Sequence, residues 1–185
     1  MGNHIFIDIE DFQNAYEERL KTYMSLKKES ENNEIMIMHL GGIIVECYLK
    51  GLIVKKYNIT KRKGINIWIS QQQVNHILQF NQITNKQIIE QNLGIKNPGH
   101  NIIEAYKSLD EIKDLIASNE DLSKKFSYIY NPLRKEKSSF IDLRYSTKSD
   151  FNNINEEFVE WTEDFKEIIR WLNKNGKLVE VEIWK

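Results

Sequence analysis

The sequence has little cysteine and proline, and polar residues interrupt its longest apolar run. The 185 residues include one cysteine, Cys47, and two prolines. A lone cysteine cannot form an intramolecular disulfide, and it fits a reducing compartment. The longest apolar run, at 35–54, is broken by His39, Glu46 and Lys50, so no uninterrupted stretch of membrane-spanning length exists. We therefore expect a cytoplasmic protein without membrane contact.

The chain also lacks a charge excess and the familiar nucleotide-binding loops. Its formal net charge is -1, so bulk electrostatics give no case for nucleic-acid binding and leave only a local basic patch. The N-terminal "MGNHIFIDIEDF" has neither the basic region nor the long apolar run of a secretory signal. Neither GxxxxGK[ST] nor GxGxxG occurs. The histidines show no close ligand spacing, and we expect no metal and no cofactor: His4, His39, His76 and His100.

Apolar residues recur at helical spacing over much of the chain. The pattern predicts one mainly α domain over 1–185, a bundle of four to five main helices with short extra helices and a core at about 8–175. The expected helices lie at about 8–30, 35–57, 101–116, 120–128 and 155–173, with short helical pieces at 71–91.

Strand-like patterns are confined to short segments. The runs "IFI" and "INIWI" and the alternation in "KLVEVEIW" predict a minor β element, with a strand-like tail at 177–185. Between the first two runs, "NITKRKG" predicts a polar, basic turn. Gly176 suits the C-terminal cap of the last helix.

The helix expected at 35–57 carries a polar stripe. At 100° per residue, His39, Gly42, Glu46 and Lys50 fall on one face. A helical glycine costs about 1 kcal/mol relative to alanine, so we expect a hollow at Gly42 and a close helix approach at Gly41. Glu46 and Lys50 form either an ordinary i,i+4 pair, which contributes about 0.3–0.5 kcal/mol, or part of a site. The second interpretation requires charged groups from other segments to converge there.

Two further segments offer such groups. "NPGHNIIEAYKSL" places His100 at the start of a predicted helix, and "SSFIDLRYSTKSD" places Arg144 and Tyr145 directly after an apolar anchor. The guanidinium fork of an arginine suits phosphate or carboxylate. Each side chain could instead face solvent or be satisfied within the core.

The blocks "MHLGGIIVECYLKGLI", "NPGHNIIEAYKSL" and "FIDLRYS" resemble, in order and spacing, the HEPN domain family of prokaryotic helical proteins. The resemblance runs from about Asp8 to Asn175. It implies an up-and-down bundle that forms a homodimer, and a role in a toxin–antitoxin, phage-defence or other RNA-linked system. Nucleotide, RNA and an antitoxin or defence-system protein are the implied partners.

The same resemblance implies that the standard nuclease site is missing. Nuclease members carry an arginine followed, after four to six residues, by a histidine near the last helix. Arg144 lies where that arginine would be, but positions 149 to 151 read Ser149, Asp150 and Phe151. Because the partner histidine is absent, the resemblance favours a binding module over an enzyme.

Two functions follow from these residues. The favoured one is a non-catalytic module that binds nucleotide, RNA or a partner protein through a polar set: His39, Glu46, Lys50, His100, Arg144 and Tyr145. The alternative is a metal-independent, RNA-cleaving effector built on Arg144, Tyr145 and His100. Cleavage through the 2′-hydroxyl needs an acid or base and a cation for the transition state, and these residue types supply both.

Three other features have a functional and a plain interpretation. A basic run beside Trp68 could contact phosphates while the indole stacks on a base, although a solvated loop is favoured: Lys55, Lys56, Lys61, Arg62 and Lys63. Cys47 lies in mid-helix on an apolar flank and is a poor candidate for a nucleophile. Trp171, off the main apolar stripe, marks either a dimer interface or a single surface tryptophan.

Overall fold

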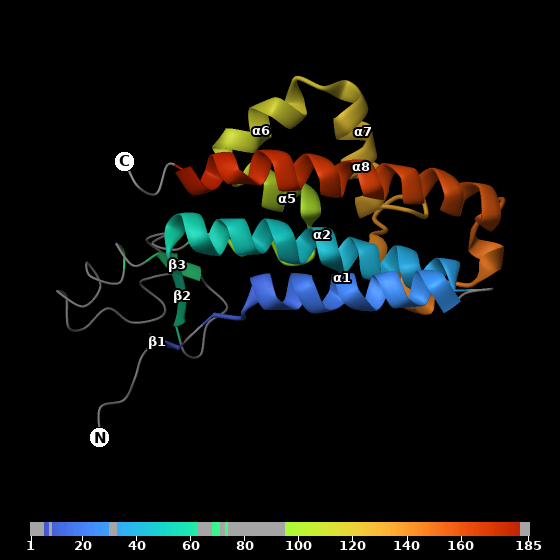
Figure 1. Cartoon of the computed structure of the whole chain (residues 1–185), viewed down its shortest axis with the longest axis horizontal. Coiled ribbons are helices and arrows are strands. Elements are labelled where there is room, and N and C mark those ends of the chain that lie inside the picture. Colours follow the sequence, from blue (N-terminus) through green and yellow to red (C-terminus); the bar gives the residue numbers. More distant parts are fainter. Residues whose placement is uncertain are drawn as a thin grey trace.

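Three long helices lie side by side along the molecule, with α2 in the middle (Figure 1). In this computed structural model α1 spans Phe12–Glu29, α2 spans Glu34–Tyr57 and α8 spans Ile154–Val181. α2 contacts both α1 and α8. The mainly helical class and the bounds expected for the first two helices are confirmed.

The structure describes residues 6–7, 9–29, 33–62, 68–70, 73 and 95–181. The helical pieces expected at 71–91 therefore lie almost wholly outside the described residues, as do His4, Lys63 and His76.

α2 is the central buried element because it is apolar nearly all round. It is long and apolar enough to cross a membrane by length and composition, and it is the one such helix found in the described part of the chain. Its neighbours bury 67% of the apolar window, as in the core helix of a soluble protein. A Cβ on Gly41 would lie 2.2 Å from the Trp161 ring of α8, so the close helix approach expected there is confirmed.

Three short helices, α5 (Ile102–Lys107), α6 (Asp110–Ala117) and α7 (Glu120–Tyr130), cover one side of the bundle. The single helix predicted at 101–116 is wrong, because the chain breaks at Ser108 and Leu109. Leu109 adopts an extended conformation and is fully buried. The Tyr57 hydroxyl donates a hydrogen bond to the Ser108 carbonyl, 3.1 Å away, and links this break to the end of α2. The helix expected at 120–128 is confirmed by α7.

α8 is longer than predicted. Residues 177–181 are helical, so the strand-like tail is wrong over those residues, and residues 182–185 lie outside the described range. Leu172, Gly176 and Val179 are all buried and continue the helical spacing of the preceding turns. Gly176 is not a cap. It provides room for Tyr48, whose hydroxyl donates a hydrogen bond to the Leu172 carbonyl, 2.9 Å away.

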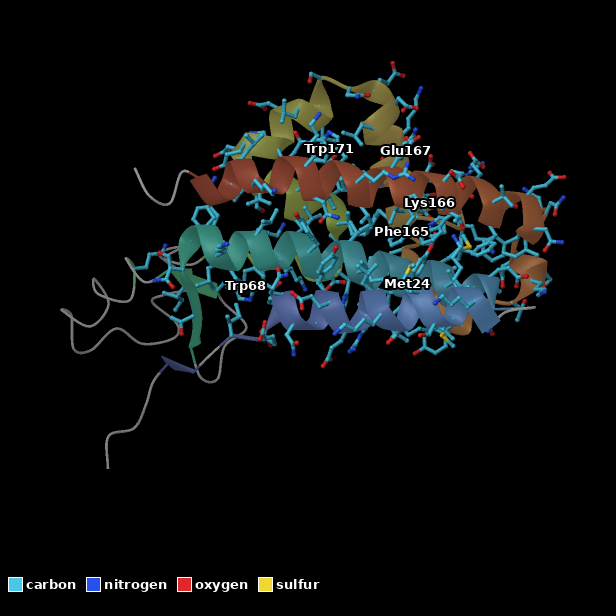
Figure 2. The ribbon with its side chains drawn as sticks, in the orientation of Figure 1. Met24, Trp68, Phe165, Lys166, Glu167 and Trp171 are labelled. Atoms are coloured by element: carbon cyan, nitrogen blue, oxygen red, sulfur yellow. The ribbon has the colours of Figure 1, made fainter. Side chains whose placement is uncertain are left out.

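The two faces of α8 pack against different partners (Figure 2). Phe165 points toward α1 and α2, and its ring lies 4.7 Å from that of Tyr23. Trp171 lies on the side toward α6 and α7, with its ring 6.2 Å from Phe126. Trp171 is therefore partly buried in an intramolecular contact and is not the free aromatic expected at an interface. The homodimer stays a prediction without that support.

A small sheet closes one end of the bundle. Its strands β1 (Phe6–Ile7), β2 (Ile59–Arg62) and β3 (Trp68–Ser70) pair antiparallel in that order. The two N-terminal strand-like runs are confirmed over these residues, but the predicted basic turn is wrong because 59–62 form the central strand. Trp68 is fully buried, with its ring 5.8 Å from Phe12. It is not available to stack on a base.

The segment between α7 and α8 is more ordered than the expected loop. It contains two short 3-10 helices, η1 (Phe140–Tyr145) and η2 (Lys148–Asp150). Phe140 and Leu143 of η1 are buried, which confirms the apolar anchor predicted there. A Cβ on Gly42 of α2 would lie 2.3 Å from the Phe140 ring. The hollow expected at Gly42 is thus wrong, because the Phe140 ring fills it.

Candidate functional site

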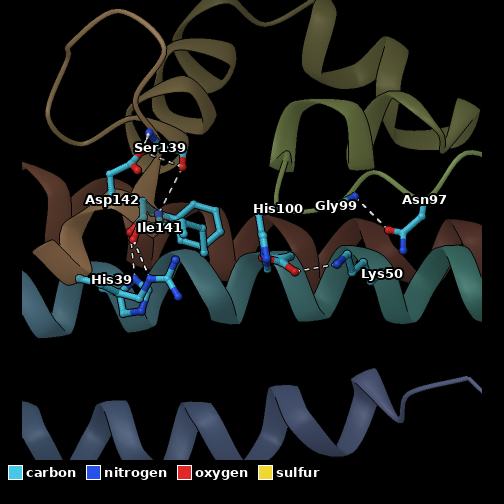
Figure 3. A network of polar contacts seen from close by, with 11 residues as sticks. His39, Lys50, Asn97, Gly99, His100, Ser139, Ile141 and Asp142 are labelled. Atoms are coloured by element: carbon cyan, nitrogen blue, oxygen red, sulfur yellow. Dashed lines mark hydrogen bonds and ion pairs between the residues drawn. The ribbon is translucent and has the colours of Figure 1, made fainter. Parts of the chain in front are cut away.

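Glu46 is the centre of a charged triad formed with Lys50 and His100 (Figure 3). Its Oε1 accepts a hydrogen bond from Lys50 Nζ at 2.7 Å, and its Oε2 lies 2.9 Å from His100 Nδ1. The Glu46 and Lys50 side chains are 7% and 8% exposed, whereas that of His100 is 65% exposed. Lys50 Nζ also lies 5.3 Å from the centroid of the Phe12 ring. A group from a distant segment therefore does converge on the Glu46–Lys50 pair.

A tight turn places His100 on this pair. In "NPGH", the Asn97 side-chain oxygen accepts a hydrogen bond from the Gly99 amide at 2.9 Å. Gly99 has a φ of +60°, which glycine adopts at little cost. Asn101 then caps α5 by accepting from the Glu104 amide at 3.0 Å. His100 thus lies just before the helix that it was expected to begin, and the turn holds it against α2.

A second polar cluster surrounds η1. The His39 Nδ1 lies 2.9 Å from the Phe140 carbonyl oxygen, so the ring donates there, and Arg144 Nε donates to the next carbonyl, that of Ile141, at 3.1 Å. Ser139 and Asp142 form a capping box at the start of η1, in which the Ser139 amide donates to Asp142 at 2.8 Å. These bonds, together with the buried Phe140, fix η1 against α2.

η1 presents the Arg144–Tyr145 pair to solvent. Tyr145 is 82% exposed, and the Arg144 guanidinium carbon lies 5.4 Å from the centroid of its ring. Among the described residues, no ion pair is recorded for Arg144, whose side chain bonds to a backbone carbonyl. A cation and an aromatic face are therefore both available to a ligand.

The two clusters are neighbours along α2, and they are separate. The Phe140 ring lies on Gly42, between His39 and Glu46. His39 and Glu46 are seven residues apart, which corresponds to about 10 Å along a helix. Within the part of the chain that the structure describes, no contact joins His100 to Arg144 or Tyr145. The predicted site residues therefore form two groups, and His100 is paired with Glu46.

Other candidates are weaker in the structure. Burial raises the pKa of the Cys47 thiol to about 11, which favours the thiol over the nucleophilic thiolate. Lys56 of the basic run forms an ion pair with Glu111 at 2.6 Å. Over the described ranges, no group of three or more His, Cys, Asp or Glu side chains could hold a metal ion.

The sequence analysis missed a groove of about 630 Å³ between α7 and α8, here called the α7–α8 groove. Arg134 lies over the Tyr128 ring at 4.1 Å and forms an ion pair with Glu160 at 2.8 Å. Burial raises the pKa of Asp164, another residue of the lining. The sequence signal for it is the acid-rich run "NEEFVEWTEDFKE" at 155–167, which supplies Glu160 and Asp164 of the lining.

In comparisons with known proteins, the chain matches no protein-family model, no curated protein and no solved structure. The HEPN resemblance therefore stays a prediction.

Proposed function

We propose that this chain binds single-stranded RNA through the Arg144–Tyr145 pair, as a non-catalytic HEPN-like module. One observation carries the proposal: an arginine without a recorded carboxylate partner in the described residues lies beside a tyrosine that is 82% exposed. Unpaired bases stack on aromatic side chains, and each such contact is worth about 1–3 kcal/mol. A guanidinium supplies the matching contact to a phosphate.

The support beneath the pair favours binding. Phe140 and Leu143 are buried on one side of η1, and Ser139 and Asp142 cap its start. Because the backbone is already fixed, little conformational entropy is lost when a ligand binds. A flexible loop with the same two residues would bind more weakly.

The cellular setting belongs to the proposal too. The HEPN resemblance supports a cytoplasmic protein of a toxin–antitoxin, defence or other RNA-linked system, acting as a homodimer with an antitoxin or defence protein. Arg144 has no histidine at the spacing of the nuclease motif, which supports a module that holds RNA without cutting it.

Fluorescence anisotropy with a labelled, unstructured RNA of about ten nucleotides tests this function. We expect the Arg144→Ala and Tyr145→Ala variants each to weaken binding by about fivefold or more. Arg134→Ala is the matched control, since it removes another exposed arginine that lies over a tyrosine, and it should bind like the wild type. Equal affinity of the wild type and both η1 variants would overturn the proposal.

One observation favours the alternative function, RNA cleavage. The His100 imidazole is oriented by a buried carboxylate, an arrangement that suits a proton acceptor. The same RNA mixtures, incubated with EDTA and run on a denaturing gel, separate the two functions. Cleavage by the wild type, lost in both His100→Ala and Arg144→Ala, would replace the binding module with an effector enzyme. Intact RNA is the expected result.

A further inference from the structure

A contribution to stability does not by itself explain the arrangement of Glu46, Lys50 and His100 in the charged triad. Two charged side chains, those of Glu46 and Lys50, are more than nine-tenths buried, and together they hold one exposed imidazole. A buried ion pair is often no more stabilising than a hydrophobic pair of similar volume. What the triad does achieve is to fix the His100 ring, with Nδ1 on Glu46 and Nε2 directed away from it.

The charges of the triad decide what the free nitrogen can offer. Lys50 balances Glu46, so the triad is neutral when the imidazole is neutral and carries one positive charge when the imidazole is protonated. A protonated imidazole donates from both nitrogens, and its Nε2 then becomes a charge-assisted donor.

Within the described residues, charged side chains of the elements next to this ring form ion pairs with one another. On its own segment and on α5, Lys96 and Glu104 form an ion pair with each other at 3.5 Å. Among the described residues of α2, Glu46 is the acid recorded within ion-pair distance of His100. α1 contributes Phe12, an uncharged residue beside Lys50. The Glu46 carboxylate is thus the charged group that the imidazole contacts directly.

The triad lies within reach of the same RNA strand. The contacts of His39 and Glu46 set the two clusters about 10 Å apart along α2. About three stacked nucleotides, at about 3.4 Å each, span this separation. An RNA of about ten nucleotides is longer than this separation, so one strand is long enough to extend from η1 to His100.

We propose that His100 is a second phosphate contact on this strand, made by the protonated imidazole, so that RNA affinity is lower at high pH than at low pH. Glu46 acts as a positioning residue for His100. The inference rests on RNA binding by the Arg144–Tyr145 pair, and it adds both a second contact and pH control of that binding.

The salt dependence of binding at two pH values tests the contact. Each phosphate contact on a single strand adds about 0.7 to the slope of log affinity against log salt. Between about 50 and about 200 mM salt, one contact corresponds to about a 2.6-fold change in affinity. We expect the wild-type slope to be larger by about 0.7 at about pH 6 than at about pH 8.

Three variants make the test specific. His100→Gln should show the smaller slope at both pH values, and His100→Lys should show the larger slope at both. His39→Gln is the matched control and should keep the wild-type difference. Retention of the full pH difference in His100→Gln would overturn the inference.

Glu46→Gln tests the positioning role. Loss of the carboxylate should leave the His100 ring without its fixed orientation, so the difference in salt slope between the two pH values should become smaller. An unchanged difference in salt slope in a folded Glu46→Gln protein would overturn the positioning role of Glu46. The His100 variants keep the test decisive if this buried substitution prevents folding.

The two proposals fail in distinguishable ways. If Arg144→Ala binds RNA like the wild type, the proposed function itself fails. If Arg144→Ala weakens binding but His100→Gln keeps the pH difference, only the contact at His100 fails.

Discussion

The Arg144–Tyr145 pair on η1 and the Arg134–Tyr128 pair beside the α7–α8 groove are both cation–ring contacts, yet their surroundings differ. The guanidinium-to-ring distance is 5.4 Å in the first pair and 4.1 Å in the second. Tyr128 is buried, and its hydroxyl donates to the Glu157 carbonyl at 3.1 Å. Tyr145 is almost fully exposed.

A close cation–ring contact is therefore not by itself an indication of a binding site. Arg134 is already paired with Glu160, and the two lysines that line its groove are also paired, Lys124 with Glu120 and Lys125 with Asp121. A phosphate that entered this groove would therefore compete with a carboxylate at each of these cations. Arg144 is held by a backbone carbonyl, and its cation is therefore available to a phosphate.

The largest effect should come from removing the support of the first pair while leaving the second in place. In Gly42→Ala the new Cβ would lie 2.3 Å from the Phe140 ring, which must then move. We expect the free energy of unfolding to fall by about 1–3 kcal/mol, as for overpacked cores. RNA affinity should fall too, because η1 shifts with Phe140. Urea unfolding followed by circular dichroism, together with RNA anisotropy, measures both.

Gly51→Ala is the control on the same helix. The nearest atom to its new Cβ is 3.8 Å away, so alanine fits, and it should raise the free energy of unfolding by up to about 1 kcal/mol. If Gly42→Ala matched Gly51→Ala in stability and in RNA affinity, the contact between Phe140 and Gly42 would not position the first pair.

The apolar spacing in the sequence correctly predicted the long helices α1 and α2. The predictions were wrong where contacts between distant residues determine the secondary structure. α1 and α2 follow their patterns closely. The break at Ser108 depends on burial of Leu109 and on the hydroxyl of Tyr57, which lies far away in sequence. The tail at 177–181 alternates like a strand, but Gly176 allows α8 to pass Tyr48 and bury Val179.

The sequence predicted the residues of the candidate site, but it did not predict which of them contact one another. The spacing of Glu46 and Lys50 predicted their ion pair, and the structure adds His100 to it. Nothing in local spacing could show that His100 meets Glu46 while Arg144 bonds to η1. The separation of His100 from Arg144 depends on the Phe140 ring, which fills the space at Gly42 between the two clusters.

Two tyrosine variants should have separate effects, one on RNA affinity and the other on the free energy of unfolding. Tyr145→Ala removes an exposed ring, so we expect a loss of about 1–3 kcal/mol of RNA binding and an unchanged free energy of unfolding. Tyr128→Phe removes the hydrogen bond to the Glu157 carbonyl, so it should cost about 0.5–1.5 kcal/mol of stability and leave RNA affinity unchanged. A weaker RNA complex with Tyr128→Phe would contradict the division.

The smallest effect is expected from Glu160→Gln, which asks whether a free cation alone makes a binding site. The Arg134 and Glu160 side chains are 55% and 56% exposed, and a surface ion pair of this kind contributes about 0–1 kcal/mol. The free energy of unfolding should therefore change by less than about 1 kcal/mol. RNA affinity, measured by anisotropy in the Arg144→Ala background, should not recover, because the Tyr128 ring remains buried and cannot stack on a base. Recovery of binding would mean that release of the arginine is sufficient, and that the exposed ring of Tyr145 is not what distinguishes the first pair.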